Sequence, residues 1–357
     1  MKHLIFNQFN LIKIFCCFLV VFQHIVGRFL NTAATTTSTH LIYGTLLNFS
    51  RFAVPIFLLI TGFVIIKSYE NLSLKQFYKT KFSKILYIYI GANLLFMIPK
   101  IFMPNYSVEL FITDFIFGKA QSHLWYMNTL IKIYLFFPIF KYIVIYLNKW
   151  LSYKSIILIT IVQYFISENA YTVLSKATNP ILSTTFTYLD RSLLIWGYYI
   201  ILGGLVYKNF DKIYSLIQKY KIYIITAFSL SLIYINLYTF NKFDFTAVNY
   251  YRSSPSSFRI LIYSILSIIV LYYIANFIVQ KDNFKILLRI KRFSKYILQI
   301  YITHPIIITF STFLMPLTNK LPFNLNALII ISLVITASTL PFYIYEITKK
   351  QKSLITR

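Results

Sequence analysis

Charged residues are scarce in this 357-residue chain: they make up 12% of it, against 58% hydrophobic residues and a mean hydropathy of +0.67. Such a low charged fraction excludes a water-soluble protein, because too few polar side chains are available to cover an apolar core. A lipid bilayer is the solvent that fits this composition. Since a spanning helix needs about 20 mostly apolar residues, the length allows roughly ten spans and no separate soluble domain.

Acidic residues and cysteines are scarcer still. Nine Asp and Glu stand against 35 Lys and Arg, which gives a formal net charge of +26. In a soluble protein this excess would indicate a nucleic-acid partner, but here the basic residues gather in alternate loops, so no nucleic-acid binding is predicted. Cys16 and Cys17 are adjacent within the first apolar run, which excludes a Cys-x-x-Cys pair or a cysteine metal cluster. We predict packing roles for both cysteines and no metal site.

What the chain does contain is a series of long apolar runs. They predict an all-α, polytopic transmembrane bundle of about ten spans, in a single domain over residues 1–357. The spans are expected at 11–30, 45–66, 84–103, 123–147, 154–170, 192–207, 222–240, 258–279, 296–315 and 325–346. The first span is expected to stay as an anchor, because no small residue precedes Cys16 for lipoprotein cleavage.

The distribution of Lys and Arg predicts the orientation. Cytoplasmic loops of membrane proteins carry an excess of both. The loops after the second and eighth predicted spans are the most basic, with Lys67, Lys75, Lys79, Lys81, Lys84, Lys281, Lys285, Arg289, Lys291, Arg292 and Lys295. The intervening loops hold few basic residues, so both termini are predicted to be cytoplasmic. The outer segments 171–191 and 241–257, rich in Thr, Ser, Asn and Tyr, either line a sugar site or are ordinary hydrated loops.

Ionisable residues at membrane depth are functional candidates, because burying them in lipid is costly. Lys13 and His24 are eleven residues apart on the first span, which places them on one helix face and about 16 Å apart along the axis. His24 has an imidazole that can take a proton from a hydroxyl and return it to a leaving group. Lys13 either binds a phosphate-bearing ligand or snorkels to the membrane surface.

Other candidates lie at the ends of spans. Lys81 and Lys84 are placed to hold phosphates at the cytoplasmic mouth, or serve only to set the topology. His123 and Trp125 open a span at the outer interface, as a site wall or an aromatic anchor. His304 precedes a proline that frees a backbone carbonyl, which predicts a functional site or a simple kink.

In combination these motifs resemble the acyltransferase 3 family of membrane proteins. Lys13 and His24 match its Arg/Lys, ten residues, His motif, and the segment 50–63, which begins with Ser50-Arg51, is similar to its second span, with Thr61 where Ser is usual. His123-Leu124-Trp125-Tyr126 resembles its His-Leu-Trp-Phe segment, and Tyr301 to Pro305 its late Tyr-x-x-His-Pro.

The resemblance implies transfer of an acetyl or other short acyl group from cytoplasmic acyl-CoA to hydroxyls of a cell-surface polysaccharide, with no bound cofactor. It implies His24 as the catalytic residue and Lys13, Lys81 and Lys84 as donor-binding residues, the last two standing where the family has Arg-x-x-Arg. The substrate-positioning residues are then expected to be Arg51, His123, Trp125 and His304.

The chain is most similar to the poly-N-acetylglucosamine (intercellular adhesin) O-acyltransferase branch, through Ile195-Trp196-Gly197-Tyr198-Tyr199 and its length. Its expected location is the bacterial cell membrane, with the lipid bilayer, the glycan acceptor and polysaccharide synthase components as partners. Two alternatives stay open. A polysaccharide exporter or flippase would move the glycan without modifying it, and a non-catalytic scaffold in a synthase complex would tolerate loss of His24.

Overall fold

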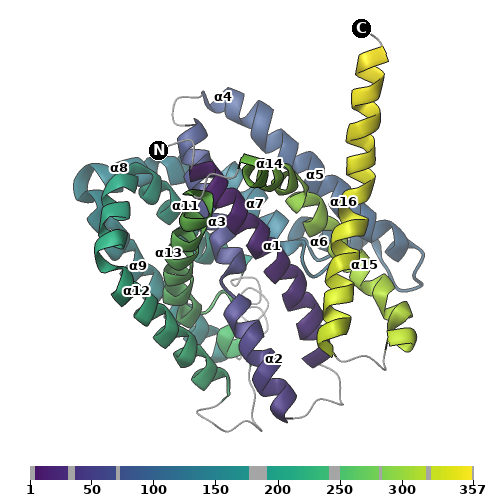
Figure 1. Cartoon of the computed structure of the whole chain (residues 1–357), viewed down its shortest axis with the longest axis horizontal. Coiled ribbons are helices and arrows are strands. Elements are labelled where there is room, and N and C mark those ends of the chain that lie inside the picture. The colour runs from purple at the N-terminus through teal and green to yellow at the C-terminus, as the bar shows by residue number, and fades with distance from the viewer. Residues whose placement is uncertain are drawn as a thin grey trace. The chain divides into compact units, whose positions relative to one another are not determined.

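The computed structural model describes residues 5–30, 37–69, 73–176, 191–240, 250–280, 284–318 and 323–355 (Figure 1). Within these ranges every regular element is helical, so the predicted all-α class is confirmed there. Most of the predicted outer segments 171–191 and 241–257, with Asp190 and Asp244, lie outside the described residues.

Seven helical stretches of the described chain are long and apolar enough to cross a membrane. They are Phe6–Arg28, His40–Ser68, Leu74–Ile101, Phe137–Asn169, Phe210–Thr239, Phe258–Gln280 and Leu325–Ile344. A shorter apolar helix, Leu193–Lys208, coincides with another predicted span. The protein is therefore a multi-pass membrane protein, whereas the predicted count of about ten spans is not confirmed.

Contacts divide the chain into two compact units, each assembled from segments distant in sequence. The first unit comprises Met1–Val54, Ile224–Ser254 and Tyr263–Arg357. Its elements are α1 (Ile5–Leu30), α2 (Thr37–Ser50), the later part of α12 (Phe210–Thr239), η5 (Tyr250–Ser253), most of α13 (Phe258–Gln280), α14 (Phe284–Phe293), η6 (Ser294–Tyr296), α15 (Ile297–Thr318) and α16 (Phe323–Ile355). Helix α1 packs against α2, α14, α15 and α16, and is the axis on which this unit is built.

The second unit comprises Pro55–Tyr223 and Pro255–Ile262. Its elements are most of α3 (Ala53–Tyr69), α4 (Leu74–Phe77), η1 (Tyr78–Phe82), α5 (Ser83–Ile101), α6 (Val108–Phe117), α7 (Trp125–Leu135), α8 (Phe137–Leu151), η2 (Ser152–Lys154), α9 (Ser155–Lys176), α11 (Leu193–Lys208) and the first part of α12. The prediction that residues 1–357 form one domain stays a prediction.

Helices α3 and α11 of the second unit pack with their backbones in contact. A Cβ atom at Gly62 would overlap the carbonyl of Ile200, and one at Gly203 would overlap that of Leu59. Only glycine permits so close an approach, as at many helix interfaces in membranes. The glycine of the Thr61-Gly62 motif therefore has a packing role in this fold.

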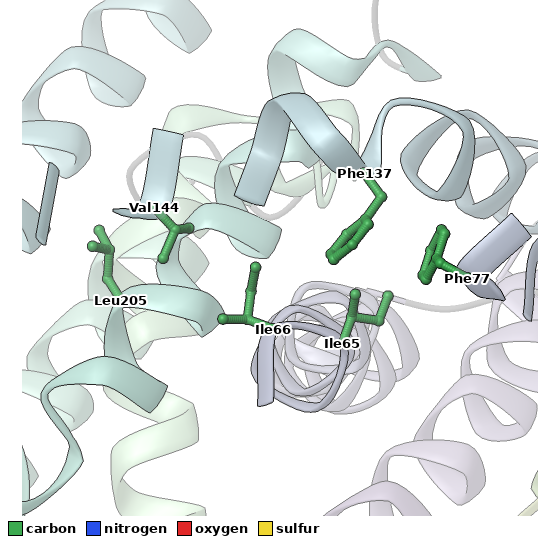
Figure 2. Close-up of a cluster of buried hydrophobic side chains, with 6 residues drawn as sticks. All are labelled: Ile65, Ile66, Phe77, Phe137, Val144 and Leu205. Carbon is green, nitrogen blue, oxygen red and sulfur yellow. The ribbon is translucent and has the colours of Figure 1, made fainter. Parts of the chain in front are cut away.

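A cluster of six buried apolar side chains lies beside this contact, and Figure 2 shows all of them: Ile65, Ile66, Phe77, Phe137, Val144 and Leu205. The rings of Phe77 and Phe137 are stacked, with centroids 4.3 Å apart. Stacking between aromatic rings adds to the stabilisation from burial. The cluster joins α3, α4, α8 and α11, and so fixes the core of the second unit.

Several boundaries differ from the sequence prediction. The second predicted span, 45–66, is interrupted at Arg51 and Phe52, where α2 ends and α3 begins. The fourth, 123–147, is divided at Phe136, because Pro138 lacks the N–H needed to continue a helix. The predicted basic loop 281–295 contains α14, whose basic residues are exposed while Ile290 is buried. The helix is amphipathic, and its many charged residues mask the apolar face when the segment is considered by composition alone.

Candidate functional site

Helix α1 positions the side chains of Lys13, His24 and Arg28. All three belong to the unbroken helix Ile5–Leu30, as the sequence predicted for the first two. Lys13 and His24 are both half-buried. Their spacing of eleven residues corresponds to about three turns, so they project from one side of α1.

The imidazole rings of His24 and His304 lie next to each other. Their centroids are 4.9 Å apart and their planes are tilted by 46°. His304 on α15 is completely buried, whereas His24 is half-buried. Among the described residues His24 has no hydrogen-bond partner, so its ring nitrogens are available to a ligand. Two predicted site residues 280 positions apart are thus brought together.

Pro305 explains how the His304 ring is held. Its nitrogen carries no hydrogen, so the carbonyl four residues earlier, that of Tyr301, has no helical donor. The His304 Nδ1 atom lies 2.7 Å from the Tyr301 oxygen and 3.1 Å from that of Ile300. Both oxygens only accept, so Nδ1 carries the proton and the lone pair of the neutral ring is on Nε2. The proline therefore provides the acceptor that fixes the histidine tautomer.

Arg51 lies at the break between α2 and α3. The break is held by side chains that donate to exposed carbonyls: Gln23 Nε2 to Ser50 O at 2.6 Å, and the Tyr263 hydroxyl to Phe49 O at 2.8 Å. Irregular backbone is tolerated at membrane depth only where its polar groups are satisfied in this way. These hydrogen bonds stabilise the break between the two helices. The guanidinium of Arg51 therefore lies at an interruption of the helical span and not on a continuous helix.

Positive charge surrounds His24 on this side. Arg28 and Arg51 both interact electrostatically with the His24 ring. Arg28 donates a hydrogen bond from Nη2 to Thr309 Oγ1 at 3.2 Å, which ties the end of α1 to α15. Arg51 is half-buried, and its buried Nε has no hydrogen-bond partner among the described residues. The site can therefore bind an anion or stabilise developing negative charge.

Tyr250 of η5 approaches Arg51 from the predicted outer segment 241–257. Its hydroxyl lies 3.1 Å from His40 Nδ1, and the two rings are stacked with centroids 6.2 Å apart. Burial raises the pKa of Tyr250 to about 12, although the positive charge of Arg51 acts in the opposite direction. Tyr250 is therefore a neutral hydroxyl at physiological pH. Gly44 leaves room for it, since a Cβ there would lie 2.7 Å from the Tyr250 oxygen.

Lys81 and Lys84 belong to the second unit. Lys81 is in the π-helical turn η1 and Lys84 in the first turn of α5, and both side chains are exposed. The turn is fixed by the Ser83 hydroxyl, which donates to Tyr78 O at 2.8 Å. Wide helical turns of this kind are frequent at functional sites. The two lysines therefore sit where a phosphate-bearing ligand can reach them.

His123 and Trp125 also belong to the second unit. His123 is 3% exposed and packs edge-on against Phe96, with ring centroids 5.2 Å apart. Trp125 is half-buried against Trp196, at 5.0 Å between centroids. Both side chains are parts of an aromatic core, which favours structural support over direct exposure at a membrane surface. Their predicted role in substrate binding stays a prediction.

Four residues at or next to the site were not predicted from the sequence: Arg28, His40, Tyr250 and Thr309. Arg28 carries a readable signal, because it follows His24 by one helical turn. The other three reach the site from distant segments and have no local signal.

Comparison with known proteins identifies the family of the chain. The family model described as an acyltransferase domain, Acyl_transf_3, matches residues 6–346. No curated protein and no solved structure matches the chain. The match covers both units and all eight predicted site residues. The chain belongs to the acyltransferase 3 family and is a membrane acyltransferase.

Proposed function

We propose that this protein transfers an acetyl or other short acyl group from cytoplasmic acyl-CoA to hydroxyls of a cell-surface polysaccharide, with His24 as the base. The observation that carries the proposal is the state of the His24 ring. It is half-buried, has no hydrogen-bond partner among the described residues, and lies 4.9 Å from the ring of His304. A base that is not engaged by protein groups is available to a substrate hydroxyl.

The reaction balances with residues of this site. A ring nitrogen of His24 takes the proton of the acceptor hydroxyl, and the oxygen attacks the thioester carbonyl carbon. The new C–O bond forms and the C–S bond breaks, so coenzyme A leaves as a thiolate. The imidazolium of His24 then returns the proton to that sulfur. Arg51, which acts electrostatically on the His24 ring, would stabilise the negative charge that develops on the carbonyl oxygen.

Donor binding is assigned to Lys13, Lys81 and Lys84. The phosphates of acyl-CoA suit ammonium groups, although lysine lacks the bidentate geometry of the arginines usual in the family. Lys13 and His24 are separated by about 16 Å along the axis of α1. That length is comparable to the arm between the phosphates and the thioester of coenzyme A, so the acyl end can reach His24.

The finer assignments follow from the sequence, through its apolar runs, its Lys and Arg distribution and its family resemblance. We propose about ten spans with both termini cytoplasmic, in the bacterial cell membrane. The acceptor is a cell-surface polysaccharide, for which the sequence resemblance suggests poly-N-acetylglucosamine as one candidate, and synthase components are its neighbours in the membrane. His304, His123 and Trp125 position substrates or the elements that bind them.

The direct test is mass spectrometry of surface glycans from cells that lack the gene or carry the wild type, His24→Ala or Phe15→Ala. We expect the deletion and His24→Ala to lose an ester-linked acyl group. Phe15, an exposed residue on the same helix, is the matched control, and its variant should retain acylation. Acylation that persists in His24→Ala, at equal membrane abundance, would reject the base. Unchanged acylation with glycan trapped inside the deletion strain would indicate an exporter.

A further inference from the structure

Arg51 carries a charge that no described side chain of its own unit balances. The guanidinium lies at a break within the candidate span His40–Ser68, where an unpaired charge is costly. Its Nε is buried without a hydrogen-bond partner among the described residues. The titratable groups that interact electrostatically with it are His24 and Tyr250, and neither is an anion that could balance it.

No carboxylate is present among the described side chains of the first unit. The acidic residues of its segments are Asp244, Asp282 and Glu346, and all three lie outside the side chains that the structure describes. A half-buried guanidinium is stabilised when an anion accepts its hydrogen bonds. A ligand anion would supply the partner that Arg51 lacks among the described side chains.

The location of Arg51 indicates which substrate supplies the anion. The end of α2 packs on the last turns of α1, where Leu47 joins a buried cluster with Val26 and Leu30. Lys13 lies toward the other end of α1, about 22 Å from Arg28 at 15 residues of spacing. His24 lies between the two ends. A donor held at Lys13 therefore leaves the Arg51 end for the second substrate.

We infer that Arg51, at the Arg28 end of α1, binds a carboxylate or phosphate group of the acceptor, so that the acceptor is an anionic member of the polysaccharide class proposed above. The stacked rings of His40 and Tyr250 form an adjoining aromatic wall, which suits the face of a sugar. The Tyr250 hydroxyl is neutral and adds a hydrogen bond without adding negative charge. The identification of the ligand as the acceptor rests on the proposed function. The inference that Arg51 binds an anion is independent of it.

The test compares two probes that differ only in charge, tetragalacturonate and its methyl ester. Their dissociation constants are measured on the purified full chain by titration calorimetry. We expect the charged probe to bind at least about tenfold more tightly, since hydrogen bonds to ionised groups are the stronger ones. Arg51→Gln should abolish the preference, and Arg51→Lys should keep part of it. Equal or undetectable binding of both probes by the wild type would overturn the inference.

Two controls determine whether the anion bound at Arg51 belongs to the acceptor, to the donor or to the protein itself. Saturating coenzyme A should leave tetragalacturonate binding unchanged, whereas displacement would assign Arg51 to the donor phosphates and overturn the acceptor assignment. Asp244→Asn should not alter the preference; a preference that exists only in that variant would show an internal counter-ion and no ligand site. An oligomer of glycerol phosphate, used as a third probe, distinguishes phosphate from carboxylate.

Transfer of a labelled acetyl group from acetyl-CoA is measured on the same samples in proteoliposomes. If binding depends on probe charge but no acetyl group is transferred, the anion site at Arg51 is supported and the proposed acyl transfer is rejected. If acetyl transfer occurs but the two probes bind equally well, the proposed acyl transfer is supported and the anion site at Arg51 is rejected.

Discussion

The Nδ1 atom of His304 lies 2.7 Å from the carbonyl oxygen of Tyr301. This is the oxygen that Pro305 leaves without a helical donor. The proline thus frees an acceptor on the same helix, and the preceding histidine occupies it. As a result the His304 ring beside His24 has a fixed orientation and a fixed tautomer, which is how groups around a catalytic histidine are usually preorganised.

Pro305→Ala is expected to lower activity while preserving the fold. Alanine supplies an N–H to the Tyr301 carbonyl, which then competes with His304 Nδ1. We expect kcat to fall by roughly tenfold, with KM little changed and thermal stability equal or higher, since an interior proline costs about 3 kcal/mol. Kinetics and melting temperature of the purified variant provide the measurement. Pro341→Ala in α16 is the matched control; an equal loss of kcat there would show that the effect is not specific to His304.

Gly62→Ala is expected to destabilise the second unit. The added methyl group would meet the backbone of Ile200, which cannot move without separating α3 from α11. A cost of about 1–3 kcal/mol is typical of overpacking, and it should appear as a lower melting temperature in detergent. Gly91→Ala in α5 is the control, because a Cβ there meets nothing within 4 Å. Equal stability of the two variants would contradict the backbone contact.

Lys81→Gln combined with Lys84→Gln is expected to raise the KM for acyl-CoA by about tenfold, with kcat nearly unchanged. The reason is that uniform binding of the donor phosphates is lost while the chemistry at His24 is not touched. Replacing both by Arg should restore or improve the KM. Lys154→Gln, at another exposed lysine of the second unit, in η2, is the control for charge alone. An unchanged KM would leave the lysines with a topological role only.

Predictions from the sequence were correct where the signal is local. The apolar runs predicted a helical membrane protein, and the spacing of Lys13 and His24 placed both on one helix, which α1 confirms. The His304-Pro305 pair indicated a freed carbonyl, although not that His304 itself would bind to it. The Arg51 break was not predicted, because 45–66 reads as one continuous apolar run. The break depends on donors from Gln23 and Tyr263, which no local pattern reports.

By itself, the sequence determined that this protein is helical, lies in a membrane and carries the motifs of an acyltransferase family, because hydropathy, charge placement and helical spacing are properties of neighbouring residues. Only the tertiary structure decided that His24 faces His304, that Arg51 and Arg28 act on the same ring, and that Tyr250 adjoins them. Those relationships join segments up to 280 residues apart. They depend on how helices pack against one another, and a one-dimensional pattern of apolar residues does not specify which faces meet.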